Sequence, residues 1–438
     1  MRVMWCALFI LFISRLAAQT PLPLEEALQL AQPGNLQLRK QQQRQRQAEL
    51  DAAIKRGQLW PSLDFSVMSS YTDKIAALEI PFSFPGVQIP RIELGGHDRT
   101  DLSLGVRQPI FTGFRLTTQV KLAETAQAAE AVRFEVLQQQ TAFQVHALFY
   151  GAQNLKKERQ IQQASLQRLH TQLAQVRNLF RQAQVLAYDT LQVFNQTLQI
   201  GMQMEQTQSD LRLLDLQLAR LLNLPQVRSI GDLALPNLPS ALLPLDSVKQ
   251  AARQQRSELR GVNLAQRAAQ LQRKLARGNY FPEIGAEARY HYAKPGINQF
   301  ANEWMAYATL GVNLQWNLWR GQQDRNRIQA VQVEYERLQL EEEELQRTIA
   351  YEVEKSWENM KLAAQQNRLA ERLLAQQQER YRIVTTQQRE GQATTNDVVI
   401  AEFDLTQAEL QVQRTLIQYY LAQTELQLAA GGLGAPKE

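Results

Sequence analysis

The fold is decided by a stretch that occurs twice. Residues 56–71 read RGQLWPSLDFSVMSSY and residues 277–292 read RGNYFPEIGAEARYHY. Both have Arg-Gly, then an aromatic residue before proline, then alternating side chains that end on tyrosine. Proline disfavours helix at the residue before it, so a helix is expected to end at Trp60 and at Phe281. The alternation that follows is typical of a strand with one apolar and one polar face.

The repetition continues along the chain. Phe111-Thr112-Gly113 corresponds to Trp319-Arg320-Gly321, which lies 208 positions later, and Asp189 corresponds to Asp397 at the same offset. A chance match would not hold one offset over so long a stretch, so we expect two copies of one structural plan. The segment 225–244 is rich in proline and leucine and is predicted to join them with little helix. The expected divisions are a first structural repeat at 19–235, a second at 236–434 and a C-terminal tail at 435–438.

Each repeat is predicted to run helix, two strands, very long helix, turn and returning helix. In the first repeat these helices cover about Leu36–Gln58, Arg115–Gln182 and Asp189–Asn223. A rise of about 1.5 Å per residue makes the long helix on the order of 100 Å. Its apolar residues alternate at spacings of three and four, as in a coiled coil: Leu166, Leu169, Leu173, Val176 and Phe180.

The two strand pairs, at 60–114 and 281–321, are predicted to be hairpins that cross a membrane. Strands of about ten residues are long enough for this when they are tilted. The polar face is expected to line a lumen, and its residues are Asp64, Ser103, Arg107, Glu287, Arg289, Asn313 and Gln315. The apolar face ends in aromatic residues, which gather at bilayer interfaces: Trp60, Phe111, Phe281, Trp316 and Trp319. The alternative is a soluble sheet that buries these aromatics in its core.

Four strands cannot close a barrel, because small closed barrels need about eight. Every strand edge in a membrane must be paired, so the chain is expected to oligomerise. The residues themselves leave two possibilities, eight strands in a dimer or twelve in a trimer.

The N-terminus is predicted to be an export signal at 1–18. Arg2 is followed by an apolar run, and small residues precede a cleavage site before Gln19. The single cysteine, Cys6, lies inside this signal, so the mature chain would have no disulfide, thiol nucleophile or thiolate metal site. The formal net charge of +5 is scattered along helices and excludes a nucleic-acid interface.

The order and spacing of these features resemble the TolC-like family of outer-membrane efflux proteins. The resemblance rests on the duplicated plan, on Trp60-Pro61 and Phe281-Pro282, on PIFTGF at 109–114 and on REGQATTNDV at 389–398. It implies a mainly α protein with membrane β-strands, in which a trimer forms a twelve-strand barrel continued by a periplasmic helical tunnel. It further implies an exit duct in the outer membrane that works with a periplasmic adaptor and an inner-membrane pump.

The resemblance also assigns roles to the two turns between long and returning helices. Such turns meet the adaptor, so the candidates for docking are Ala183, Val185, Asp189, Gly391, Ala393 and Asp397. A periplasmic gate is expected after the second turn, with Asp397 and Ile400 as candidates. Family members often have a basic residue where this chain has Ala393 and a second aspartate where it has Ile400. The alternative for Asp397 is a carboxylate that stabilises the start of a helix.

No other function is indicated by the sequence. The four histidines are far apart and have no second ligand at metal-binding spacing. Phosphate-binding loops, nucleophile elbows and dinucleotide fingerprints are missing, so neither an enzyme nor a bound cofactor or metal is expected. A different class of function is a periplasmic coiled-coil scaffold or the adaptor subunit of an export pump. The cargo (drug, metal ion or protein) depends on the partner pump and stays open.

Overall fold

The computed structural model describes residues 21–78, 92–93, 96–235, 238, 244–298 and 300–432. The predicted signal at 1–18 and the tail at 435–438 lie outside these residues. The chain divides into two compact units, each described by itself. The helical unit draws on 1–42, 132–259 and 344–438, and the strand unit on 43–131 and 260–343. Each unit therefore takes segments from both repeats.

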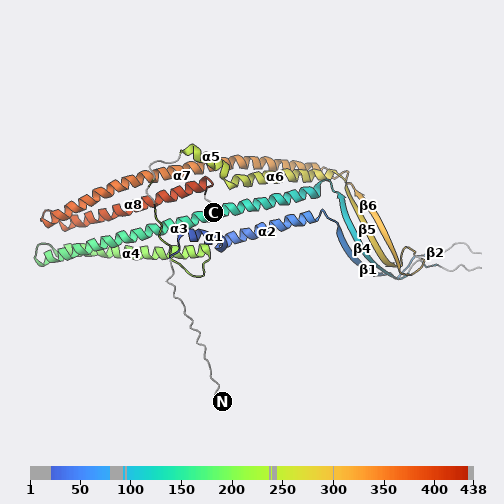
Figure 1. Ribbon diagram of the computed structural model, residues 1–438, viewed down its shortest axis with the longest axis horizontal. Coiled ribbons are helices and arrows are strands. Elements are labelled where there is room, and N and C mark those ends of the chain that lie inside the picture. The colour runs from blue at the N-terminus through green and yellow to red at the C-terminus, as the bar shows by residue number, and fades with distance from the viewer. Residues whose placement is uncertain are drawn as a thin grey trace, which may run out of the picture. The chain divides into compact units, whose positions relative to one another are not determined.

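The strand unit contains a four-stranded antiparallel sheet (Figure 1). Its strands, in spatial order, are β1 (Ser62–Tyr71), β4 (Asp98–Phe111), β5 (Glu283–Lys294) and β6 (Met305–Gln315). β1 pairs with β4 and β5 pairs with β6, and the β4–β5 pair joins one repeat to the other. Two short strands, β2 (Ala77–Leu78) and β3 (Ile92–Glu93), pair between β1 and β4.

The two junctions from strand to long helix use the same backbone conformation. Gly113 and Phe114 have φ of 60° and 61°, and Gly321 and Gln322 have φ of 57° and 64°. This left-handed region favours glycine, which explains the glycine in both repeats. A Cβ at Gly113 would also lie 2.5 Å from the carbonyl oxygen of Gly278, so the close approach of two segments requires glycine there.

The helices come in pairs of nearly equal length, one from each repeat. The long helices α3 (Arg115–Arg181) and α7 (Gln323–Arg389) have 67 residues each. The returning helices α4 (Ala187–Leu222) and α8 (Thr395–Ala429) have 36 and 35 residues. Before the strands lie α2 (Leu36–Gly57) and α6 (Ser257–Arg277), the latter followed by a 3₁₀ turn at Gly278–Tyr280. These lengths confirm the predicted internal duplication.

One additional helix in each repeat corrects the expected plan. α1 (Leu24–Gly34) precedes α2 and α5 (Leu245–Gln255) precedes α6. The break before α2 falls at Asn35, whose Oδ1 accepts hydrogen bonds from the N–H groups of Gln37 and Leu38 at 2.8 and 3.1 Å. Asn35 thereby caps α2 and separates it from α1.

Two buried apolar clusters in the helical unit are each formed mainly by one repeat. In the first repeat Phe149 of α3 and Leu218 of α4 pack with Leu22 and Ile230. The described linker residues 225–235 contain no helix, as predicted, but Ile230 is buried and forms a parallel bridge to Leu22. In the second repeat Tyr419 and Tyr420 of α8 occupy the equivalent core with Val353 of α7.

Candidate functional site: a two-faced sheet and two helical turns

One face of the sheet is apolar and open to the surroundings. Directly opposed residues in neighbouring strands share a face, so Phe65 of β1, Leu104 of β4 and Tyr290 of β5 lie side by side. The most exposed members are Leu310 and Val312 of β6, at 84% and 76% of their full surface. A monomeric soluble protein rarely exposes an apolar patch of this extent, so the face is built for an apolar environment.

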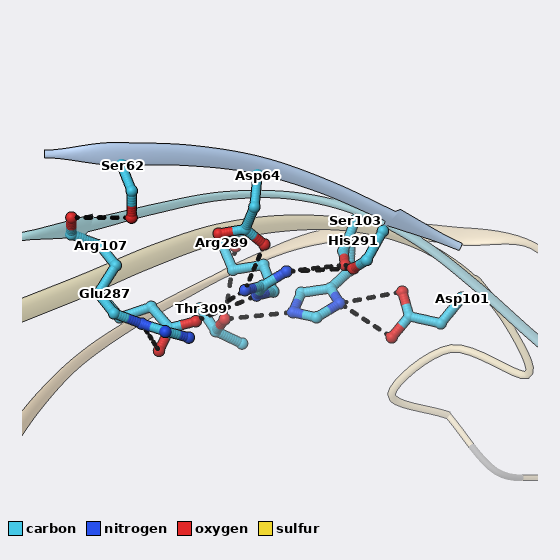
Figure 2. Close-up of polar contacts among 10 residues, drawn as sticks. Ser62, Asp64, Asp101, Ser103, Arg107, Glu287, Arg289, His291 and Thr309 are labelled. Carbon is cyan, nitrogen blue, oxygen red and sulfur yellow. Dashed lines mark hydrogen bonds and ion pairs between the residues drawn. The ribbon is translucent and has the colours of Figure 1, made fainter. Parts of the chain in front are cut away.

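The opposite face carries a connected polar network (Figure 2). Arg289 of β5 donates hydrogen bonds to Asp64 of β1 at 2.9 Å, to Ser103 of β4 at 3.1 Å and to Glu287 at 3.0 Å. The register places the predicted lumen residues on this one face: Asp64, Ser103, Arg107, Glu287, Arg289, Asn313 and Gln315. The alternation read from the sequence therefore holds across all four strands.

His291 lies in the same network. Its Nδ1 is 3.0 Å from Asp101 Oδ1 on β4, and its Nε2 is 3.3 Å from the hydroxyl of Thr309 on β6. The imidazole stacks on Tyr307 with 4.8 Å between ring centroids. These partners are a carboxylate, a hydroxyl and a ring, so the histidine is a member of the polar face and no metal ligand set surrounds it.

Aromatic residues stand at both ends of the apolar face. At the helix-proximal end, Phe111 and Phe281 form an edge-to-face trio with Phe114 at centroid distances of 5.5 to 6.4 Å. The other three predicted interface residues, Trp60, Trp316 and Trp319, are exposed. The far end has a second group that the sequence analysis did not identify: Tyr71, Tyr292 and Trp304 are exposed there, and the last two stack at 4.8 Å.

The spacing of the two aromatic groups matches a bilayer. β1 has ten residues, ends at Tyr71 and begins two residues after Trp60. At about 3.3 Å per residue and a tilt of about 40°, it spans roughly 25 Å, which is the height of the apolar band of outer-membrane strands. The sequence does indicate this second group, because tyrosine occurs at equivalent positions of the two repeats, Tyr71 and Tyr292.

The sheet has two open edges. Within the described residues β1 pairs only with β4, and β6 pairs only with β5. The outer edge of each of these strands therefore presents backbone N–H and C=O groups without a ladder partner. Such groups cannot stay unpaired in hydrocarbon, so a membrane environment requires further strands at both edges.

The second helical turn is capped on both sides. Gly391 has φ of 73°, and Thr394 precedes α8. Asp397 Oδ2 accepts hydrogen bonds from the Thr394 hydroxyl at 2.7 Å and from its N–H at 2.9 Å, while the Asp397 N–H donates to Thr394 Oγ1 at 3.2 Å. These bonds, with a smaller effect of the Arg380 charge, lower the pKa of Asp397. The structure thus confirms the helix-start role of Asp397.

An acidic residue that the sequence analysis missed lies beyond the two gate candidates. Asp397 and Ile400 are exposed on α8, and Asp404 is one turn further on the same face. Asp404 Oδ2 pairs with Arg380 Nη1 of α7 at 2.5 Å. Asp404 is seven residues after Asp397, and a spacing of seven keeps two residues on the same face of a helix as well as a spacing of three does.

The first helical turn is less well capped and more apolar. Ala183 takes the left-handed conformation, with φ of 54°, where the second repeat has Gly391. Leu186 stands before α4 and has no side-chain oxygen, although Asp189 Oδ2 still accepts its N–H at 2.9 Å. Leu186 and Tyr188 are 73% and 68% exposed. Among the docking candidates, Val185 is partly buried against an apolar cluster that includes Val176 and Val193, whereas Ala183 is exposed.

The two helical hairpins meet in a buried seam near these turns. Glu402 of α8, only 2% exposed, accepts hydrogen bonds from Ser165 of α3 at 2.7 Å and from Arg168 at 3.2 Å. Arg168 also pairs with Glu409 at 3.1 Å. Helices α3, α4 and α8 also form a buried apolar cluster: Leu169, Leu173, Val176, Val193, Ile200 and Val399.

The sequence matches a family model described as outer membrane efflux protein at residues 27–224 and 248–432. The first segment lies within 19–235 and the second within 236–434, and the stretch between them is not matched. The chain belongs to the outer membrane efflux protein family. This efflux protein is accordingly an outer-membrane exit duct of a tripartite efflux system.

Solved structures share the fold of this efflux protein. The outer-membrane channel OprN is 16% identical, with a TM-score of 0.77 over 93% of this chain and 90% of that one. CusC is 15% identical, with a TM-score of 0.78 over 93% and 92%. VceC of Vibrio cholerae is 14% identical, with a TM-score of 0.76 over 94% and 96%. Curated protein sequences gave no match.

None of the described helices is both long and apolar enough to span a membrane. No group of three or more His, Cys, Asp or Glu side chains in the described part of the efflux protein is arranged to hold a metal ion.

Proposed function

We propose that this efflux protein is a trimer whose twelve strands close a barrel in the outer membrane and whose helices form a periplasmic tunnel. The duct conducts its cargo passively, holds no cofactor and catalyses no reaction. A periplasmic adaptor docks on the helical turns and connects the duct to an inner-membrane pump. The observation that carries this proposal is a sheet with two open edges, an exposed apolar face and a polar face opposite it.

The apolar face supports the membrane location. A Leu, Val or Phe side chain gains about 1.5–3 kcal/mol when it leaves water completely. At least seven such side chains are exposed on this face: Leu63, Phe65, Val67, Leu104, Leu310, Val312 and Leu314. Transfer of the face into lipid is therefore favoured by on the order of 10 kcal/mol per chain.

The size of the polar side chains supports a trimer over a dimer. A barrel of eight strands has an interior that side chains just fill, and larger barrels hold water. Each chain directs Arg107, Glu287, Arg289 and His291 to the polar face. Two copies of this face would fill an eight-stranded barrel, whereas three copies leave a water-filled lumen for cargo.

Exposed stripes on the helices support the same assembly. On α4 an apolar stripe repeats every three or four residues: Leu191, Phe194, Leu198 and Met202. On α7 another stripe contains Leu362, Leu369, Leu373 and Ile383. Spacing of this kind packs helices side by side in coiled coils, so neighbouring chains would cover these stripes.

The two turns are proposed to contact the adaptor in different ways. Leu186 and Tyr188 give the first turn an apolar surface, and the exposed residues of the second turn near Gly391 are polar. The docking candidates from the sequence belong to these two turns: Ala183, Val185 and Asp189 in the first, and Gly391, Ala393 and Asp397 in the second.

The periplasmic gate is proposed to lie on the exposed face of α8 formed by Asp397, Ile400 and Asp404. Three copies of each carboxylate around a narrow axis would attract cations. The isoleucine ring between them would add an apolar constriction that favours loss of water. Arg380 neutralises Asp404 within the same chain, which leaves Asp397 as the stronger charge.

A periplasmic scaffold or adaptor subunit is the competing function. Family membership and the exposed apolar face support the duct instead. Membrane fractionation separates the two, because a scaffold stays soluble without detergent. The assembly is tested by mass measurement in detergent, for which we expect three chains. A stable monomer or dimer would reject the twelve-stranded barrel.

The gate is tested by single-channel conductance in planar bilayers. Asp397→Ala should lower cation selectivity and block by divalent cations, while mass measurement should still give three chains. Asp189→Ala is the matched control, since Asp189 occupies the equivalent position in the first turn. Equal selectivity and block in the parent and Asp397→Ala would place the constriction elsewhere.

A further inference from the structure

Arg289 lies flat on the polar face of the sheet. Its guanidinium makes five hydrogen bonds, to Glu287 twice and to Asp64, Ser66 and Ser103. Five is also the number of N–H donors in a guanidinium. The side chain is only 17% exposed, although it stands on an open sheet face (Figure 2). The positively charged guanidinium is thus held against the polar face of the sheet and does not project away from it.

This position requires the arginine to cross a whole strand. Arg289 of β5 is opposite Gly105 of β4, and Gly105 is opposite Asp64 of β1. Neighbouring strands are about 4.8 Å apart, so the side chain reaches across roughly 10 Å to the second strand. Its path runs directly over Gly105, which is buried for that reason.

A side chain at position 105 would occupy the place of the guanidinium. A Cβ there would lie 2.7 Å from both Cζ and Nη2 of Arg289, closer than atoms of this kind approach. The clash is with the free end of a flexible side chain and involves no backbone atom. A substitution at Gly105 would therefore leave the strand in place and move the arginine off the wall.

We infer that Gly105 is a specificity-determining position of the duct, because it lets Arg289 lie against the barrel wall where its charge is neutralised and leaves the lumen open. The inference rests on the proposed function, in which the polar face lines the lumen. Asp64 and Glu287 neutralise Arg289, and Arg107 is 3.8 Å from Glu287. Two basic and two acidic groups thus give this level of the wall no net charge.

Two substitutions should change ion selectivity in opposite directions. Gly105→Val moves the positive charge toward the axis, so conductance should fall and anion permeability should rise relative to cation permeability. Arg289→Gln leaves one uncompensated negative charge per chain, so cation permeability should rise. We expect changes of roughly twofold or more in the permeability ratio at 0.1 M salt and smaller ones at 1 M, because the screening length drops from about 10 Å to about 3 Å.

Gly311→Val is the matched control. Gly311 of β6 lies opposite Glu287 on the same polar face, and a Cβ there meets nothing within 4 Å. It adds the same bulk to the lumen without moving an arginine. In the double variant Gly105→Val/Arg289→Gln there is no guanidinium to displace. The valine should therefore change conductance and the permeability ratio by no more than Gly311→Val does.

The measurement is single-channel conductance and reversal potential in planar bilayers under a salt gradient, with trimer mass checked for each variant. Equal conductance and selectivity of Gly105→Val and Gly311→Val would overturn the role of Gly105. If Gly105→Val does not assemble, Arg289→Gln still tests the inference. Unchanged ion selectivity in Arg289→Gln would contradict the claim that Arg289 neutralises acidic groups in the barrel wall. A parent protein that forms trimers and conducts no ions would reject the proposed function itself.

Discussion

The two helical turns have equivalent positions in the duplicated chain and are stabilised differently. In the second turn Gly391 takes the left-handed conformation, and Thr394 and Asp397 exchange hydrogen bonds at the start of α8. In the first turn Ala183 takes that conformation, and Leu186 provides no side-chain acceptor. An L-residue there costs roughly 1–2 kcal/mol, and a missing cap about 1 kcal/mol.

We infer from this difference that the two copies have separate roles. The first turn gives up local stability and exposes Leu186 and Tyr188, which suits a surface that a partner covers. The second turn is ordered by its own residues and lies beside the gate candidates Asp397 and Ile400. We therefore expect the second turn to hold its conformation without the adaptor and the first to gain order when the adaptor binds.

The largest effect is expected from Gly391→Val. A β-branched residue at φ of 73° is strained, and the second turn should lose about 1–2 kcal/mol of local stability. Hydrogen exchange should speed up at the amides that close the turn, those of Gly391 and Gln392. Exchange in the first turn serves as the internal control. Unchanged exchange at Gln392 would show that the glycine is not needed there.

Thr394→Ala should destabilise the start of α8 by about 1 kcal/mol, because it removes the side chain that accepts from Asp397 N–H. Hydrogen exchange in the first turn of α8 reports the loss. The matched change is Leu186→Ala at the same position of the first repeat, where no cap exists to be lost. If Thr394→Ala and Leu186→Ala raised hydrogen exchange equally at the starts of α8 and α4, the difference in capping between the two turns would be contradicted.

Ala183→Gly should stabilise the first turn by about 0.5 kcal/mol. It relieves left-handed strain, and the gain is reduced by the greater freedom of glycine in the unfolded chain. Slower exchange at the amides of Ala183 and Gln184, which close this turn, is the expected result. Faster exchange there would mean that the left-handed conformation of Ala183 is set by neighbouring residues and carries no strain that glycine relieves.

The smallest effect is a pH dependence of the second turn. The pKa of Asp397 is lowered from its ordinary value of 3.8, first by the hydrogen bonds from Thr394. A carboxylate with a lowered folded pKa contributes stability above the unfolded pKa, and this contribution is lost as pH falls through the folded value. Hydrogen exchange at the start of α8, corrected for the intrinsic rate, should therefore speed up below about pH 4. Asp397→Asn should abolish the change, and a pH dependence that persists in this variant would exclude Asp397 as its source.

Much of the fold follows from local sequence signals. Trp60-Pro61 and Phe281-Pro282 end helices, and period-two alternation predicts the strands and their two faces. The glycines at 113 and 321 mark left-handed turns at equivalent places. The capping role of Asp397 was predictable as well, because Thr394 stands three residues before it.

Other features depend on partners distant in sequence. Asp404 is identified by its ion pair with Arg380, 24 residues earlier, and Glu402 by its burial against Ser165 and Arg168 of the other repeat. Arg289 and Gly105 are 184 positions apart, and nothing near either residue indicates that one lies over the other.

Periodicity and helix breakers act within a few residues, so the sequence alone is sufficient to specify the repeats, the strands and which side chains share a face. Pairing between strands and helices brings together residues that the sequence separates, and it depends on the packing of the whole chain. Only the tertiary structure therefore decided that Arg289 crosses β4 over Gly105 and that Arg168 meets Glu402 in a buried seam, because register and burial are properties of the assembled elements.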